Sequence, residues 1–160
     1  MEPTLHFLCG KMASGKTTLS GQLAERYNAI LICEDKWLQQ MFPTEIASFD
    51  DYLKYSKRLK AVVAPHVQEL LLKGMSVVLD FPANVPATRA WMRSIFESAK
   101  AKHVLHFVDT PNERCIEQLH KRNREKPAGS MEMTVEQFEY ITSLFVPPDD
   151  SEGFDIRIHG

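Results

Sequence analysis

The stretch GKMASGKT at residues 10–17 is the feature that most constrains how this chain can fold. It matches the pattern G-x-x-x-x-G-K-[ST], in which the glycines let the backbone turn so that successive N–H groups point inward at phosphate oxygens. The stretch follows a short apolar run and precedes a helical pattern, which is the context that such a turn requires. The sequence therefore predicts a strand, a phosphate-binding loop and a helix, in that order.

Each residue of this loop has an expected role in holding a nucleoside triphosphate. Lys16 would reach the β- and γ-phosphates, and the Thr17 hydroxyl would bind Mg²⁺. The N-terminus of the helix that follows would add its positive partial charge. ATP and Mg²⁺ are therefore the expected cofactors, and the expected nucleotide contacts are Gly10, Lys11, Met12, Ala13, Ser14, Gly15, Lys16, Thr17 and Thr18.

Short apolar runs alternate with longer amphipathic runs along the rest of the chain. This alternation is typical of an α/β protein whose parallel sheet carries helices on its faces. The length of 160 residues fits a single domain over residues 1–160. Strands are predicted at residues 5–9, 29–33, 76–80, 104–109 and 154–158, and helices at residues 15–27, 51–73 and 86–100 and on both sides of a polar stretch at residues 123–133.

Composition narrows the expected partners and compartment. Lys plus Arg number 19 and Asp plus Glu number 21, so the net charge of −2 provides no general attraction to nucleic acid or to an anionic membrane. No apolar run approaches the roughly 18 residues that span a bilayer, and residues 1–4 do not resemble a signal peptide. We expect a cytoplasmic protein, monomeric or homodimeric, with no membrane partner.

The phosphate-binding loop fits several classes of NTPase, and other features of the sequence separate them. The chain has no N-K-x-D segment to select guanine, and its D-x-x-G at residues 150–153 lies far from the third-strand position of a GTPase switch. A motor ATPase needs more chain than 160 residues provide. A kinase that phosphorylates a small molecule is the interpretation that fits best.

Acidic residues follow the second and third predicted strands, at the sheet edge where open α/β proteins bind their ligands. Asp35, with Glu34 as the second choice, could accept the proton of an acceptor hydroxyl, although Asp35 could instead cap a helix. Asp80 could hold Mg²⁺ or contact the acceptor, or it could be a turn carboxylate. We expect Glu34, Asp35 and Asp80 to bind the acceptor, and Thr17 with Asp80 to bind the metal.

Other polar residues near strand ends have a structural explanation. Asn84 is expected to cap the helix that Pro86 opens, and Thr110 with Glu113 forms the sequence of a capping box. Arg89 lies one turn inside the helix after Pro86. It is a candidate ligand for an anionic acceptor, and a solvated helical arginine is the alternative.

A cationic cluster leads into the polar stretch near residue 123. It contains Lys121, Arg122, Arg124 and Lys126, more positive charge than a favourable helix C-terminus needs. We therefore predict a short lid over approximately residues 122–134. In this lid Arg122 and Arg124 would balance charge on the transferring phosphoryl group, and Arg122 would also contact the nucleotide.

Together these motifs resemble the small P-loop kinases, a group that contains chloramphenicol phosphotransferases, zeta-toxin-like kinases, gluconate and shikimate kinases and polynucleotide 5′-kinase domains. The loop is specific, whereas C-E-D at residues 33–35, V-V-L-D at 77–80 and K-R-N-R at 121–124 support the resemblance jointly. The resemblance implies a P-loop NTPase three-layer sandwich with a short lid and a five-stranded parallel sheet of order 2-3-1-4-5. It also implies Mg·ATP as the phosphoryl donor.

The resemblance further implies that Asp35 is the base, that Arg122 and Arg124 are lid arginines, and that the acceptor binds across approximately residues 36–74. Acidic and aromatic side chains in that region suit a small molecule such as a sugar, a nucleoside or an antibiotic-like compound. Two alternatives stay open. One is a polynucleotide 5′-hydroxyl kinase, which the net charge makes less favoured; the other is an ATP-binding switch with slow hydrolysis.

Overall fold

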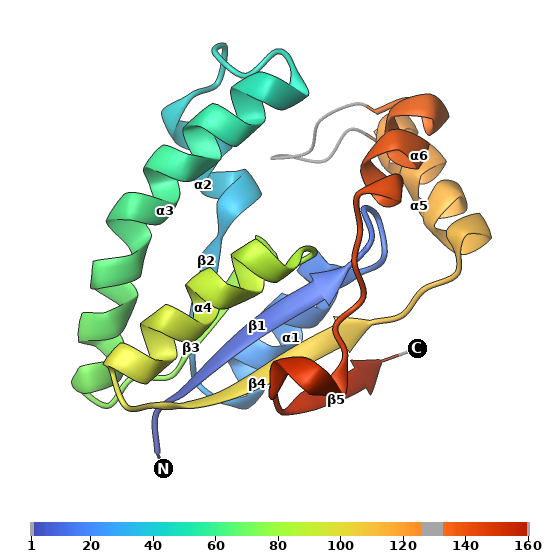
Figure 1. The fold of residues 1–160 in the computed structure, drawn as a ribbon. Helices are drawn as coiled ribbons and strands as arrows, with labels where there is room; N and C mark the ends of the chain where they lie inside the picture. The colour runs from blue at the N-terminus through green and yellow to red at the C-terminus, as the bar shows by residue number, and fades with distance from the viewer. Residues whose placement is uncertain (1, 126–132, 160) are drawn as a thin grey trace.

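A five-stranded parallel sheet forms the centre of the computed structural model, which describes residues 2–125 and 133–159 (Figure 1). Its strand order is β2-β3-β1-β4-β5, which confirms the order that the resemblance implied. Each strand lies within about two residues of its predicted position. The strands are β1 (Thr4–Gly10), β2 (Ile30–Cys33), β3 (Val77–Pro82), β4 (Lys102–Val108) and β5 (Ile156–His159).

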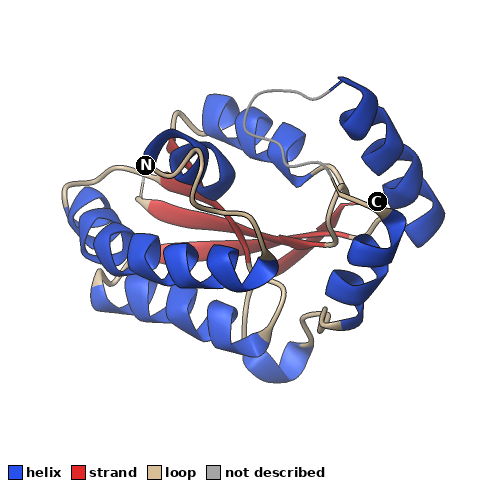
Figure 2. Cartoon of the chain, turned by 90° about the horizontal axis from the view of Figure 1, so that it is seen from above, coloured by secondary structure: helices blue, strands red, loops and turns tan. Residues whose placement is uncertain are grey.

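Helices cover both faces of this sheet (Figure 2). Successive side chains of β1 point to opposite faces of the sheet. Leu5, Phe7 and Cys9 therefore join the buried cluster on one face, and Leu8 joins the cluster on the other. The first cluster lies under α3 and α4, and the second lies under α1. The helices are α1 (Lys16–Arg26), α2 (Glu34–Met41), α3 (Phe49–Leu72), α4 (Pro86–Ser98), α5 (Asn112–Glu125) and α6 (Val135–Ser143).

Helices α5 and α6 pack together beside the phosphate-binding loop (Figure 1). Their contact is a small apolar cluster of Cys115, Leu119 and Phe138, which Met12 and Ala13 of the loop also join. Thr134 begins α6 with a capping box, since its hydroxyl accepts from the N–H of Gln137 at 3.1 Å. The loop and the two helices thus form one packed unit.

Strand register brings the predicted site residues to one edge of the sheet. Cys33 pairs with Asp80, and Gly10 pairs with Val108, so the carboxyl ends of these four parallel strands lie along the same edge of the sheet. The pairing of β1 with β3 shifts between Phe7 and Leu8, a bulge of the kind often found beside functional sites. No helix within residues 2–125 and 133–159 is long and apolar enough to cross a membrane.

Candidate active site

The backbone between β1 and α1 forms a tight turn with free N–H donors. Ala13 and Gly15 have left-handed backbones, with φ of 60° and 104°, and the N–H of Ser14 donates to the carbonyl of Lys11 at 3.1 Å. A Cβ at Gly10 would lie 2.9 Å from the Val108 carbonyl oxygen, so only glycine fits there. The first N–H groups of a helix have no acceptor within it, so the start of α1 offers donors to an anion.

The side chain of Lys16 folds back into this turn. Its Nζ donates to the carbonyl oxygen of Gly10. Burial lowers the pKa of Lys16, while the negative charges of Asp80 and Asp35 oppose that effect. The ammonium group therefore lies among the loop N–H groups and two carboxylates. The Lys16 ammonium and the loop N–H groups together would attract an anion that enters the loop.

The loop fits a triphosphate in a second respect. The Oγ of Ser14 is buried, and no described atom forms a hydrogen bond with it. A buried hydroxyl without a partner is rare in folded proteins, and a bound phosphate oxygen would satisfy this one. Thr17 and Thr18 are exposed at the start of α1, and Lys11 is half-buried.

Asp80 lies beside the first turn of α1, where a magnesium site would need it. The Oγ of Ser20 is 2.8 Å from the carbonyl oxygen of Thr17 and 3.1 Å from Oδ2 of Asp80. The Sγ of Cys33 is 3.6 Å from the same carboxylate oxygen. A hydroxyl and a carboxylate are the hard oxygen ligands that Mg²⁺ takes beside phosphates. Thr17 and Asp80 therefore fit the predicted metal role.

Two residues that the sequence explained as helix caps instead support the phosphate-binding loop. Oδ1 of Asn84 accepts from the N–H of Gly10 at 2.9 Å, and Val85 rather than Asn84 is the N-cap of α4. Oγ1 of Thr110 donates to the carbonyl oxygen of Ser14 at 2.9 Å. The capping predictions at these residues missed this role. Both residues follow strands that flank β1, so the sheet-edge rule could have indicated them.

Four charged side chains meet at this edge of the sheet. Burial raises the pKa of Asp35, and the neighbouring carboxylate of Asp80 raises it further. The cations Lys16 and Arg122 act on the same carboxyl group in the opposite direction. Asp35 retains contact with water on the first turn of α2, whose N-cap is Cys33, so the alternative that Asp35 itself caps the helix is wrong. The structure thus brings Lys16, Asp35, Asp80 and Arg122 within electrostatic reach of one another.

Glu34, the other acid after β2, is engaged by helix α3. It is 1% exposed and accepts hydrogen bonds from the hydroxyls of Tyr52 and Ser56, the latter at 2.6 Å. Burial raises its pKa, and the two hydroxyl donors oppose this. Glu34 therefore ties the predicted acceptor region to α2. Its carboxylate is already satisfied by protein groups.

Arg89 is fully buried and packed into the protein interior, so the expectation of a solvated helical arginine is wrong. Its Nε pairs with Glu152 at 2.9 Å, and its Nη1 donates to the carbonyl oxygens of Ala83 and Val146, each at 2.9 Å. These contacts connect α4 to the segment that follows α6. They give Arg89 a structural role and leave its predicted role as an acceptor ligand without support in the geometry.

Lys121, Arg122 and Arg124 of the cationic cluster lie on helix α5 rather than in a loop, whereas Lys126 lies outside the described residues. Helix α5 continues to Glu125, so the predicted start of the polar loop at residue 123 is wrong. Arg122 is half-buried and acts on Asp35, whereas Arg124 is exposed. Residues two positions apart on a helix point in nearly opposite directions, which explains the difference. Most of the predicted lid, residues 126–132, lies outside the described residues.

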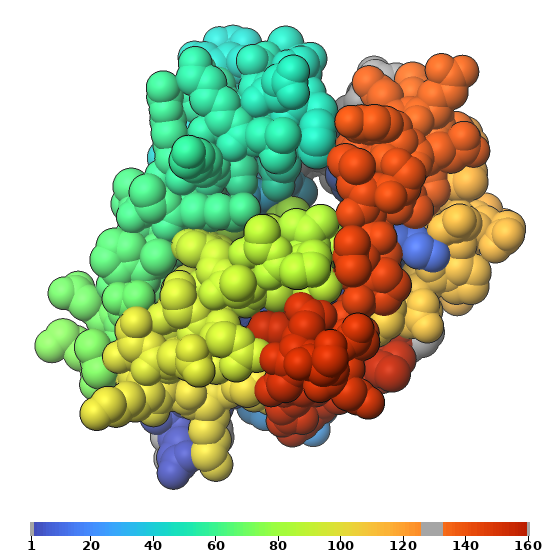
Figure 3. Space-filling view, viewed as in Figure 1, coloured from blue at the N-terminus to red at the C-terminus, as the bar shows by residue number. Residues whose placement is uncertain are grey.

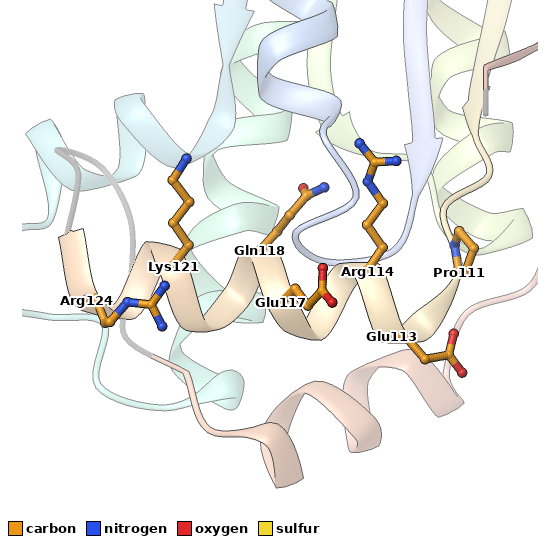
Figure 4. A pocket seen from close by; sticks show the side chains of 7 residues that line it. All are labelled: Pro111, Glu113, Arg114, Glu117, Gln118, Lys121 and Arg124. Carbon is orange, nitrogen blue, oxygen red and sulfur yellow. The ribbon is translucent and has the colours of Figure 1, made fainter.

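Arg124 lines an open depression of about 650 Å³ along α5 (Figure 4). Charges of both signs line it, and the lining residues are Pro111, Glu113, Arg114, Glu117, Gln118, Lys121 and Arg124. The depression does not include Lys16 or Asp35. The structure therefore separates Arg124 from the group that Arg122 joins.

The sheet order and the glycine-rich loop together define a P-loop NTPase. The AAA domain family (AAA_33) matches residues 5–148, and the chain therefore belongs to that family. A comparison with curated proteins gives no match.

Solved structures share the fold at low sequence identity. Kti12 of Chaetomium thermophilum, in complex with ADP-AlF3, has a TM-score of 0.72 and 19% identity, covering 97% of this chain and 88% of that one. A candidate kinase of Chloroflexus aurantiacus has a TM-score of 0.79 and 19% identity, covering 98% and 84%. APS kinase CysC of Mycobacterium tuberculosis, in complex with AMPPNP and APS, has a TM-score of 0.61 and 17% identity, covering 98% and 87%. The resemblance to small P-loop kinases is thus confirmed at the level of the fold.

Proposed function

We propose that this protein transfers the γ-phosphoryl group of Mg·ATP to a hydroxyl group of a small molecule. The observation that carries this proposal is the meeting of Lys16, Asp35, Asp80 and Arg122 at the end of the phosphate-binding loop. A binding loop alone would serve any NTPase. A carboxylate of raised pKa beside two cations adds what a kinase needs, a proton acceptor and groups that balance phosphoryl charge.

Each residue has a role that follows from its position. The N–H groups of residues 11–16 and the Lys16 ammonium would hold the phosphates. Arg122 would stabilise negative charge on the transferring group, and Asp35 would accept the proton of the acceptor hydroxyl. Thr17 and Asp80 would hold Mg²⁺, which supplies charge neutralisation when bound.

Known relatives by fold support the class of substrate. APS kinase CysC was crystallised with AMPPNP and APS, and the fold comparison with it covers 98% of this chain. Kti12 was crystallised with ADP-AlF3. At 17% and 19% identity these proteins share the fold, so the choice of acceptor for this chain rests on experiment.

A transfer screen with γ-labelled ATP tests this proposal. When pools of sugars, nucleosides, antibiotics and oligonucleotides are offered with Mg²⁺, label should appear on one of the three small-molecule classes. Asp35→Asn should lower transfer roughly 10²- to 10⁴-fold with ATP affinity unchanged. Asp109→Asn is the matched control, because Asp109 is another exposed acid directly after a strand, and it should transfer normally.

Other results of the same screen would overturn the proposal. Label found as inorganic phosphate with every pool would indicate an ATP-hydrolysing switch. Label found on oligonucleotides alone would indicate a polynucleotide kinase. An Asp35→Asn variant with normal transfer would remove Asp35 from the role of base.

A further inference from the structure

Aromatic rings connect helix α6 to the carboxylate that precedes Asp35. The ring of Tyr140 on α6 meets that of Phe49 at the start of α3 edge to face, with centroids 6.3 Å apart and an interplanar angle of 88°. Phe49 stacks on Tyr52 at 5.9 Å, and the Tyr52 hydroxyl donates to Glu34. We call Tyr140, Phe49 and Tyr52 the aromatic bridge. It joins the helix that follows α5 to the first turn of α2.

The aromatic bridge runs from the surface of α6 to the acids that follow β2. Its inner end, the Tyr52 hydroxyl, lies near enough to Asp35 for that carboxylate to affect the pKa of Tyr52. Its outer end is open to solvent, since Tyr140 is 59% exposed. Figure 3 shows the start of α3 meeting α6 above an opening that lies over α4. The Tyr140–Phe49 contact thus joins the two segments that meet above this opening.

The contact between α3 and α6 is formed by two aromatic rings, those of Phe49 and Tyr140. Residues on an exposed surface are usually polar, yet two aromatic rings meet here across the gap between α3 and α6. Elsewhere α3 packs on α2, α4 and β3, and α6 packs on α5. An edge-to-face ring pair is attractive but weak enough to open for a ligand.

We propose that the Phe49–Tyr140 contact excludes water from the phosphoryl group, so that the acceptor hydroxyl rather than water receives it. This inference rests on the proposed kinase function. In the competing reaction a water oxygen bonds to the γ-phosphorus as the bond from that phosphorus to the oxygen of ADP breaks. The water loses one proton, and the products are ADP, inorganic phosphate and that proton. Phe49 and Tyr140 act as positioning residues, since their ring contacts are with each other and with Tyr52.

Hydrolysis of ATP without any acceptor tests the inference on the full chain with Mg²⁺. Tyr140→Ala and Phe49→Ala should each raise the hydrolysis rate roughly 3- to 10-fold, the range that the loss of one aromatic pair corresponds to. The double variant should be no faster than the single ones, because both remove the same contact. Affinity for a fluorescent ATP analogue should stay unchanged, which a general loosening of the site would not allow.

Two control variants isolate the ring contact. Tyr140→Phe keeps the ring and should hydrolyse ATP at the wild-type rate. Leu144→Ala removes another exposed apolar side chain from the end of α6 and should also leave the rate unchanged. Tyr140→Ala carries the test if Phe49→Ala does not fold, because Tyr140 is mostly exposed.

Unchanged or slower hydrolysis in Tyr140→Ala, with ATP binding intact, overturns the inference. Single-variant effects that multiply in the double variant also overturn it, since the residues would then act separately. Failure of the proposed kinase function has a different signature: the variants hydrolyse ATP faster, but no acceptor pool takes up label in the transfer screen.

Discussion

Oδ1 of Asn84, which follows β3, accepts a hydrogen bond from the backbone N–H of Gly10, the last residue of β1, at 2.9 Å. The same residue accepts from the N–H of Val146 through its carbonyl oxygen, also at 2.9 Å. Asn84 therefore holds the first residue of the phosphate-binding loop and the segment after α6 at once.

Replacement of Asn84 should weaken ATP binding. Asn84→Ala leaves the Gly10 N–H without its acceptor, which costs about 1–3 kcal/mol. A loss of that size in holding the loop's shape corresponds to roughly a 5- to 150-fold loss of ATP affinity. Asn84→Asp keeps the acceptor oxygen but adds a negative charge beside the phosphates. It should unfold at the wild-type denaturant concentration and still bind ATP weakly, as titration with a fluorescent ATP analogue will show. Normal ATP affinity in both variants would contradict this role.

The sequence predicted the sheet, the loop and the positions of Asp35 and Asp80, because hydrophobic runs and strand ends are local signals. It assigned Asn84 and Thr110 as helix caps, whereas both side chains support the phosphate-binding loop. An Asn or a Thr that follows a strand suits either role, so the sequence does not distinguish the two. It also misjudged Arg89, whose partner Glu152 lies 63 residues away. Contacts of that separation depend on how the chain packs, and no local pattern reports them.

Arg89→Met should destabilise the fold strongly. The change leaves Glu152 without its partner and removes the donor from the carbonyl groups of Ala83 and Val146. Breaking such a pair costs about 3 kcal/mol, at the lower end of the usual range because Glu152 is partly exposed. Lys102→Met is the control on β4, where the exposed Lys102–Glu2 pair is worth about 1 kcal/mol or less. Urea unfolding measures both. Equal losses in the two variants would show that burial of Arg89 contributes nothing special.

The pH dependence of phosphoryl transfer should depend on Arg122. Transfer by an ionised base is lost as pH falls through its pKa, and the pKa of Asp35 is raised by burial and by Asp80. The acidic limb of the rate profile should therefore lie above the value near 3.9 of an ordinary aspartate. Removal of a nearby cation raises that pKa further, so Arg122→Gln should move the limb to higher pH. Arg124→Gln, on the other side of α5, should leave it in place, and a shift of equal size in both variants would argue against the assignment.

A chain of histidines across the sheet should make the fold sensitive to acid. His6 Nδ1 lies 3.0 Å from His106 Nε2, and His106 Nδ1 lies 3.0 Å from His159 Nε2. Burial lowers the pKa of His6 to about 4, with a contribution from Arg157. It lowers that of His106 to about 3, with contributions from the neighbouring histidines and Arg157. Both rings are therefore neutral in the folded protein at pH values where an unfolded chain already binds protons.

Because the unfolded chain binds more protons below pH 6.5, stability is complete above that pH and falls as the pH decreases toward 4. The loss should be on the order of 3 kcal/mol for each ring. His106→Gln, which keeps a donor and an acceptor, should flatten this decline in urea unfolding between pH 7 and pH 4. His66→Gln, a change at an exposed histidine on α3, should leave the slope as in the wild type. An identical slope in the His106→Gln variant would show that the buried histidines do not control the acid response.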